Sequence, residues 1–214
     1  MTATVDVPTE AGPGRLVLDV PRAPRAVLLL GHGAGGGLDS FDLSTLAAQL
    51  PAGGIGVVRF AQPWLVAGRK IAGPPASLDK AWAAALAVAT RKWRGTPLVV
   101  GGRSAGGRVA CRCFAAPAVG VLALAFPLHP PGKPEKSRRD ELAAVPAPVL
   151  IVQGETDPFG TPHEIRAAIR ANAGKRTLVT VNAGHSLQPA KRADPAAASR
   201  RIVDAVAGFV DQIT

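Results

Sequence analysis

Tyrosine is absent from this chain of 214 residues, and aromatic residues make up only 4% of it. Proteins that bind single-stranded nucleic acid stack bases on aromatic side chains. The chain has 25 Lys and Arg against 15 Asp and Glu, a net charge of +10. These cations are spread along the sequence, and the densest group, 133–139, contains Glu135 and is followed by Asp140. We expect a solvated basic surface and no nucleic-acid partner, with polyanion binding as the alternative.

Cysteine is scarce as well. Only Cys111 and Cys113 occur, and their C-x-C spacing differs from the C-x-x-C of redox and zinc sites. Side chains two residues apart on a helix point in different directions, so we expect no disulfide between these two. We interpret both as small packing residues.

Long apolar runs are missing too. No run approaches the ~20 residues of a membrane-spanning helix. Residues 1–6 lack a basic stretch followed by an apolar one, so no secretory signal is visible, and we expect a cytoplasmic protein without membrane contact. The length fits one domain, 1–214, with a single large core.

Short, uninterrupted apolar runs alternate with segments of helical periodicity. This alternation predicts an α/β fold with a mostly parallel sheet buried on both faces. A capping box, Thr161 with Glu164, predicts one helix start, and Ser77 is the expected N-cap of another. The expected strands are 4–7, 15–20, 26–30, 55–60, 97–100, 119–126, 149–153 and 177–181; the expected helices are 43–50, 77–94, 105–114, 161–171 and 195–212.

One predicted strand leads into Gly102-Arg103-Ser104-Ala105-Gly106, and a helix-like segment follows. This is G-x-S-x-G in the strand–turn–helix setting of a nucleophile elbow. Glycine on both sides permits a sharp turn that lifts Ser104 off the sheet with its hydroxyl free. Ser104 is therefore the candidate nucleophile.

Other strands end in loops that carry the groups a serine nucleophile needs. A serine hydroxyl requires a base, for which His185 is the candidate, and a carboxylate to orient that base, for which Asp157 is the candidate. A glycine-rich loop, 31–37, follows the first long strand. The order of oxyanion loop, Ser, Asp and His along the chain is that of the α/β hydrolases.

The negative charge of a tetrahedral intermediate needs backbone N–H donors already in place. We expect these from Ala105 and Ala34, with Gly33 or Gly35 as alternatives to Ala34. Candidate substrate-pocket residues are Gly33, Gly35, Arg103 and His129.

Arginines also flank the elbow. Arg103 and Arg108, with Arg69 and Lys70 near the mouth, favour small or anionic substrates. The alternative is that Arg103 and Arg108 lie on the outer face of the elbow helix. His129 lines the pocket or faces solvent.

Further polar residues have simpler interpretations. His32 is expected to orient its own loop, and His163 to be structural within the capping box. Asp39 and Asp42 are expected to cap the next helix, and Asp140 is a rival for the triad acid. Although 31–36 fits G-x-G-x-x-G, no acidic residue follows the next strand and no G-K-[ST] occurs, which disfavours a nucleotide site.

Four motifs together resemble one branch of the α/β-hydrolase superfamily: 31–35, 101–108, 127–135 and 153–160. This branch contains the testis-expressed and NSL-complex-subunit-3-like hydrolase domains and small bacterial relatives of dienelactone hydrolases. Ser104 stands where dienelactone hydrolases carry cysteine, so a lactone substrate is not implied.

The resemblance implies an α/β-hydrolase fold without a large cap, a Ser104–Asp157–His185 triad, and no metal or organic cofactor. It predicts a carboxylesterase-like serine hydrolase acting on a small-molecule acyl substrate, as a monomer or small homo-oligomer. The alternative is a catalytically silent binding or scaffold protein, because some relatives act as scaffolds in larger complexes.

Overall fold

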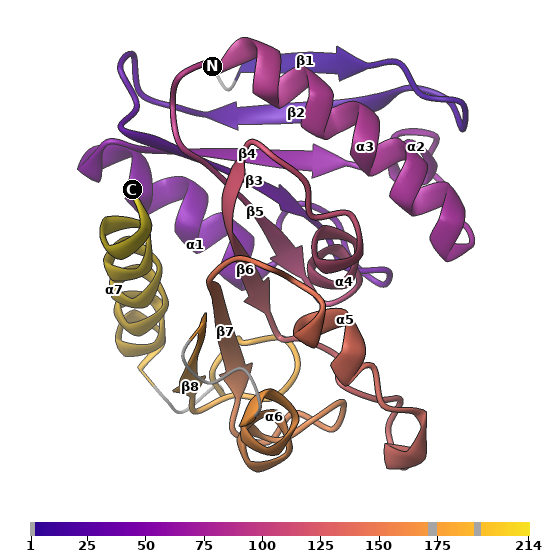
Figure 1. The fold of residues 1–214 in the computed structure, drawn as a ribbon, viewed down its shortest axis with the longest axis vertical. Helices are drawn as coiled ribbons and strands as arrows, with labels where there is room; N and C mark the ends of the chain where they lie inside the picture. Colours follow the sequence, from indigo (N-terminus) through magenta and orange to yellow (C-terminus); the bar gives the residue numbers. More distant parts are fainter. Residues whose placement is uncertain (1–2, 171–174, 191–193) are drawn as a thin grey trace.

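The computed structural model describes residues 3–170, 175–190 and 194–214. An eight-stranded sheet in the order β1-β2-β4-β3-β5-β6-β7-β8 forms its centre (Figure 1). The first two strands run antiparallel to their neighbours, and the remaining pairs are parallel, as predicted. The strands are β1 (Ala3–Val7), β2 (Gly14–Asp19), β3 (Ala26–Gly31), β4 (Ile55–Ala61), β5 (Leu98–Arg103), β6 (Ala118–Leu124), β7 (Val149–Gly154) and β8 (Arg176–Val181).

Helices cover both faces of this sheet (Figure 1). On one face, α1 and α7 contribute Leu46 and Val206 to one buried cluster. On the other face, α3, α4, α5 and α6 pack in a second cluster that includes Trp82 and Ile165. The helices are α1 (Phe41–Gln49), α2 (Pro63–Val66), α3 (Pro75–Lys92), α4 (Ala105–Arg112), α5 (Arg139–Ala143), α6 (Pro162–Ile169) and α7 (Pro195–Ile213), with short 3₁₀ helices at Leu50–Gly53 and Pro134–Lys136.

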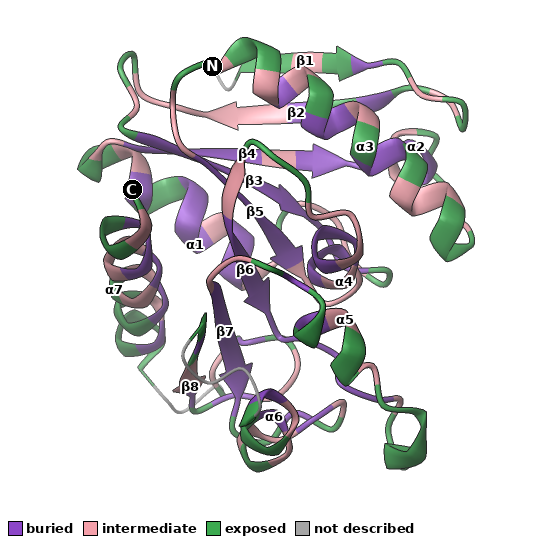
Figure 2. Ribbon diagram, viewed as in Figure 1, coloured by how far each residue is buried: buried purple, intermediate pink, exposed green. Residues whose placement is uncertain are grey.

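Strand β3 shows why the central strands are largely apolar. Its successive side chains point to opposite faces, so Val27 and Leu29 join the α3–α6 side while Leu28 and Leu30 join the α1–α7 side. All six of its residues are buried, as Figure 2 shows for the middle of the sheet. Fully burying such a side chain stabilises the fold by about 1.5–3 kcal/mol.

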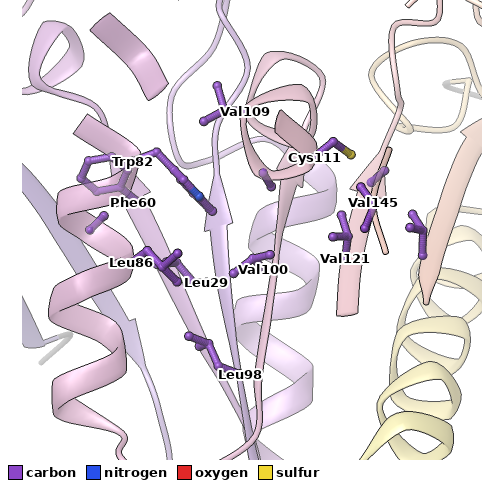
Figure 3. Packing of buried hydrophobic residues seen from close by; sticks show 14 of the residues in the cluster. Leu29, Phe60, Trp82, Leu86, Leu98, Val100, Val109, Cys111, Val121 and Val145 are labelled. Carbon is purple, nitrogen blue, oxygen red and sulfur yellow. The ribbon is translucent and has the colours of Figure 1, made fainter. Parts of the chain in front are cut away.

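Aromatic residues are few, yet two of them, Trp82 of α3 and Phe60 of β4, are among the largest fully buried side chains. Trp82 and Phe60 are fully buried and meet edge to face, with ring centroids 6.3 Å apart. Leu29 and Val100 pack beside them from the sheet (Figure 3). Helix α3 is thereby anchored against the strands that lead to the predicted elbow.

One of the two predicted helix starts is wrong and the other is confirmed. Helix α3 begins at Pro75 with Pro74 as its N-cap, so Ser77 lies inside the first turn and the N-cap prediction is wrong. Proline suits the first helical position because its missing N–H needs no partner there and its φ is already helical. The Thr161–Glu164 capping box of α6 is confirmed; the expected end of this helix at 171 lies outside the described residues.

The connection from β6 to β7 contains only a 3₁₀ turn and the five-residue α5, so the described residues hold no large cap over the sheet. None of the described helices combines the length and apolar character that crossing a membrane requires.

Candidate active site

Ser104 occupies a sharp turn between β5 and α4. Its φ of 50° and ψ of −111° are unusual for a residue with a side chain, and its N–H donates to the Leu124 carbonyl at 2.8 Å. The first turn of α4 lies directly against the end of β3: a Cβ added to Gly106 would lie 2.4 Å from the Gly31 carbonyl. Only glycine allows this approach, which explains the second glycine of the motif.

Three predicted side chains from three separate loops meet at this turn. The Nε2 atom of His185 lies 2.9 Å from the Ser104 hydroxyl oxygen, and its Nδ1 lies 2.8 Å from Oδ2 of Asp157. Because a carboxylate only accepts hydrogen bonds, Nδ1 carries the proton in the neutral ring and Nε2 is left as an acceptor. Nε2 is thus oriented to accept the serine proton.

Asp157 is fully buried, and three donors satisfy its carboxylate. Besides His185, the Gln153 side-chain amide donates to Oδ2 and the Phe159 N–H donates to Oδ1, both at 2.9 Å. The same Gln153 nitrogen lies 3.2 Å from the Phe126 carbonyl oxygen and 2.8 Å from that of Gly160, so its two hydrogens are shared among three acceptors that link the Asp157 loop to the segment after β6. The carboxylate is therefore held in one orientation.

The loop of His185 is fixed on both sides. Toward the acid, the Ala183 carbonyl accepts a hydrogen bond from the Thr156 N–H at 3.1 Å. The Phe159 ring lies over the imidazole with centroids 4.3 Å apart. Toward the elbow, the Arg103 guanidinium donates to the His185 carbonyl at 3.1 Å.

The loop after β3 approaches Ser104 at Gly33, where an added Cβ would lie 3.6 Å from the serine Cβ. The next residue, Ala34, and Ala105 both line a small recess beside the elbow. Ala105 is the first residue of α4, where N–H groups have no partner within the helix. Gly35, next along the loop, is exposed with open space around it.

His32 holds this loop, as the sequence predicted. Its Nδ1 donates to the Gly33 carbonyl at 2.9 Å, and its Nε2 accepts from the Gln62 N–H at 3.1 Å. Burial lowers the pKa of His32, which favours the neutral ring that this pair of bonds requires. His32 is therefore a structural residue of the loop after β3.

The two arginines near the elbow have different surroundings. Arg103 ends β5 and its guanidinium contacts the His185 carbonyl, so the alternative expectation that it lies on the outer face of the elbow helix is wrong. Arg108 fits that expectation: its guanidinium forms two hydrogen bonds with Glu141 of α5, at 2.6 and 2.8 Å.

The remaining candidates are His129, Asp140, Arg69 and Lys70. The His129 ring bonds Glu164 and the Pro130 carbonyl, and it lines a groove of about 540 Å³ to which no triad residue contributes. Its contact with substrate stays a prediction. Asp140, Arg69 and Lys70 are exposed.

The expectation that Asp42 caps the next helix is wrong. Asp42 lies in the first turn of α1, two residues after the N-cap residue Ser40. Its side chain is fully buried, and its Oδ2 lies 3.5 Å from Nε of Arg103. Sequence reasoning also missed Gln153 and Phe159. Gln153 did carry a signal, because it is a polar residue at the end of an otherwise apolar strand.

No cluster of three or more His, Cys, Asp or Glu side chains suited to a metal ion occurs within 3–170, 175–190 and 194–214.

Several solved structures share this fold at low sequence identity. XC6422 from Xanthomonas campestris, described as an α/β serine hydrolase without a lid, is 18% identical with a TM-score of 0.78, covering 97% of this chain and 94% of that one. Est1E from Butyrivibrio proteoclasticus is 15% identical with a TM-score of 0.75, covering 98% and 100%. A serine hydrolase homologue from Coxiella burnetii is 16% identical with a TM-score of 0.73, covering 100% and 99%.

The sequence itself carries the family assignment. Residues 24–213 match the family described as alpha/beta hydrolase domain, so this chain belongs to the alpha/beta hydrolase domain family.

Proposed function

We propose that this protein is a serine hydrolase that cleaves ester, thioester or similar acyl bonds of small molecules through an acyl-enzyme. The observation that carries the proposal is the position of His185, whose two ring nitrogens lie 2.9 Å from the Ser104 hydroxyl and 2.8 Å from Asp157. A serine, a base and an orienting acid in this arrangement are what nucleophilic acyl transfer requires.

In the first half-reaction, Ser104 Oγ attacks the acyl carbon while its proton passes to His185 Nε2. The carbonyl oxygen becomes negative and accepts hydrogen bonds from the N–H groups of Ala34 and Ala105. When the tetrahedral intermediate collapses, the imidazolium returns the proton to the leaving alcohol or thiol, and the acyl group remains on Ser104.

In the second half-reaction, water takes the place of the leaving group. The water oxygen attacks the acyl carbon while His185 accepts a proton from the water. His185 then protonates Ser104 Oγ as the carboxylic acid departs. Asp157 keeps Nδ1–H directed toward itself throughout and stabilises the positive ring.

The test combines a fluorophosphonate probe, which labels activated serines, with p-nitrophenyl esters of increasing acyl length. The wild-type chain should be labelled and should hydrolyse the shorter esters. Ser104→Ala should lose labelling and lower kcat by at least about 10³-fold. Ser137→Ala, which removes an exposed serine, is the matched control and should retain both properties.

The acid is tested in the same assay. Asp157→Asn should lower kcat by about 10²–10⁴-fold because the amide no longer fixes the imidazole tautomer. Asp140→Asn, at the exposed rival carboxylate, should have no effect. Normal turnover in Asp157→Asn would show that the acid is misassigned. A folded wild-type chain that neither reacts with the probe nor hydrolyses any ester would favour the silent scaffold instead.

A further inference from the structure

A buried ion pair lies next to the predicted triad without belonging to it. Asp42 is fully buried and the Arg103 side chain is 14% exposed, with Oδ2 and Nε 3.5 Å apart. Removing two charges from water costs as much as their attraction returns, so a buried pair contributes little net stability. Arg103 is the variable residue of G-x-S-x-G and directly precedes the candidate nucleophile.

The Arg103 guanidinium reaches three segments that form the site. Nε faces Asp42 at the start of α1, and Nη2 donates to the His185 carbonyl, 82 residues away in the chain. Nη1 lies 2.9 Å from the position that a Cβ on Gly33 would take, so it borders the oxyanion loop. A planar guanidinium holds such partners in fixed relative directions, which an ammonium group does not.

We propose that the Asp42–Arg103 pair is a positioning device that holds the His185 loop against the elbow and so sets the distance from His185 to Ser104. The inference rests on the proposed hydrolase function. The charge of Asp42 holds the Arg103 guanidinium in place. The guanidinium in turn holds the His185 backbone through a charge-assisted hydrogen bond to its carbonyl oxygen.

The arrangement of the other restraints explains why this contact matters. Two hydrogen bonds from Thr156 to the Ala183 carbonyl fasten the loop of His185 to the loop of Asp157. These bonds lie on the side of the imidazole that faces away from Ser104. Among the described residues, Arg103 makes the one hydrogen bond that joins the His185 backbone to the elbow strand. A displacement of about 1 Å between base and nucleophile is sufficient to cost about 10²-fold in rate.

The primary test is Arg103→Met. Its kcat on a p-nitrophenyl ester should fall about 10- to 100-fold while KM changes little, because the contact is with the base and not with substrate. Amide hydrogen exchange in residues 183–187 should become faster. Arg108→Met is the matched control: it removes another partly buried, ion-paired arginine at the same elbow and should leave both readouts unchanged.

Two further variants keep the test decisive if Arg103→Met folds poorly. Asp42→Asn preserves shape and should show the same pair of changes at smaller size. Arg103→Ala should regain part of its kcat when millimolar guanidinium is added, whereas ethylammonium, which lacks the planar fork, should restore less.

Unchanged hydrogen exchange in 183–187 of folded Arg103 and Asp42 variants would overturn the inference, whatever the rates. A parallel rise in KM with constant kcat would also overturn it, since that pattern indicates substrate binding by Arg103. Neither result would disturb the hydrolase proposal, which depends on Ser104 labelling. Conversely, loss of loop protection in a chain without esterase activity would support the positioning device and contradict the proposed function.

Discussion

At the residue scale, Ser104 combines chemical and conformational specialisation. The backbone conformation of Ser104, with φ 50° and ψ −111°, is strained by about 1–3 kcal/mol for a residue other than glycine. Contacts with the surrounding structure must offset this strain. The hydrogen bond from its N–H to Leu124 and the close packing of Gly106 on Gly31 hold the turn. The strained backbone directs the hydroxyl to His185 and not into the core.

Asp42 gives a prediction about pH. Burial raises the pKa of its carboxyl above the ordinary value, although the Arg103 charge opposes the shift. As pH rises above about 4, the Asp42 carboxyl of the unfolded chain loses its proton, whereas that of the folded chain keeps it to a higher pH. The contribution of Asp42 to the free energy of unfolding therefore falls until the pH exceeds the folded-state pKa. The stability of wild type relative to Asp42→Asn should therefore decrease with rising pH.

Urea unfolding of the two proteins across the acidic range measures this difference. Asp39→Asn serves as the control for losing a carboxylate, because the Asp39 side chain is 98% exposed. A difference between wild type and Asp42→Asn that stays constant or grows with pH would contradict the predicted sign.

At the element scale, the close approach of α4 to β3 determines where the elbow lies. Gly106→Ala places a methyl group 2.4 Å from the Gly31 carbonyl, where backbone atoms surround it and no flexible side chain can move away. We expect a loss of about 1–3 kcal/mol in the free energy of unfolding, together with reduced esterase activity.

Gly208→Ala in α7 is the matched control for this substitution. A Cβ at Gly208 meets open space, and alanine favours a helix over glycine by about 1 kcal/mol. This variant should be more stable than wild type. Thermal unfolding of both variants tests the pair, and equal effects of the two substitutions would show that the α4–β3 contact is looser than described.

The order of strands and loops was predictable from the sequence because most residues of strands β3 to β7 are apolar or glycine. Three loops each carried one residue of an established chemical set, so Ser104, Asp157 and His185 could be brought together without coordinates. Helix starts were less predictable: Ser77 and Pro75 both suit a helix N-terminus, and local sequence alone does not decide between them.

The supporting residues could not be predicted because their signals are ambiguous. An aspartate in the first turn of a helix is usually a surface residue that complements the helix dipole, whereas Asp42 is fully buried and faces Arg103. Phe159 resembles any loop aromatic until the chain brings it against His185. Such contacts join segments far apart in sequence, which periodicity does not report.

At the scale of the whole molecule, the family match begins after the N-terminal hairpin. Strands β1 and β2 lie before residue 24, yet Val7 and Leu16 are fully buried in the core cluster that contains Trp82. The hairpin extends the sheet beyond β4 and shares the apolar core of the matched region. It is therefore an integral part of this structure and not an appendage.

The cations that give the net charge of +10 are spread along the sequence, and this spread predicts weak, unspecific binding to polyanions. Retention on heparin should disappear by about 0.15 M salt, because dispersed surface charges are screened over about 8 Å at that ionic strength. Two variants test this, each with three exposed cations replaced by glutamate: one at Lys133, Lys136 and Arg139, the other at Arg91, Lys92 and Arg94. The two variants should show equally weakened retention on heparin at low salt. If only the first variant abolished retention, residues 133–139 would form a discrete polyanion site, and the prediction of a merely solvated basic surface would be wrong.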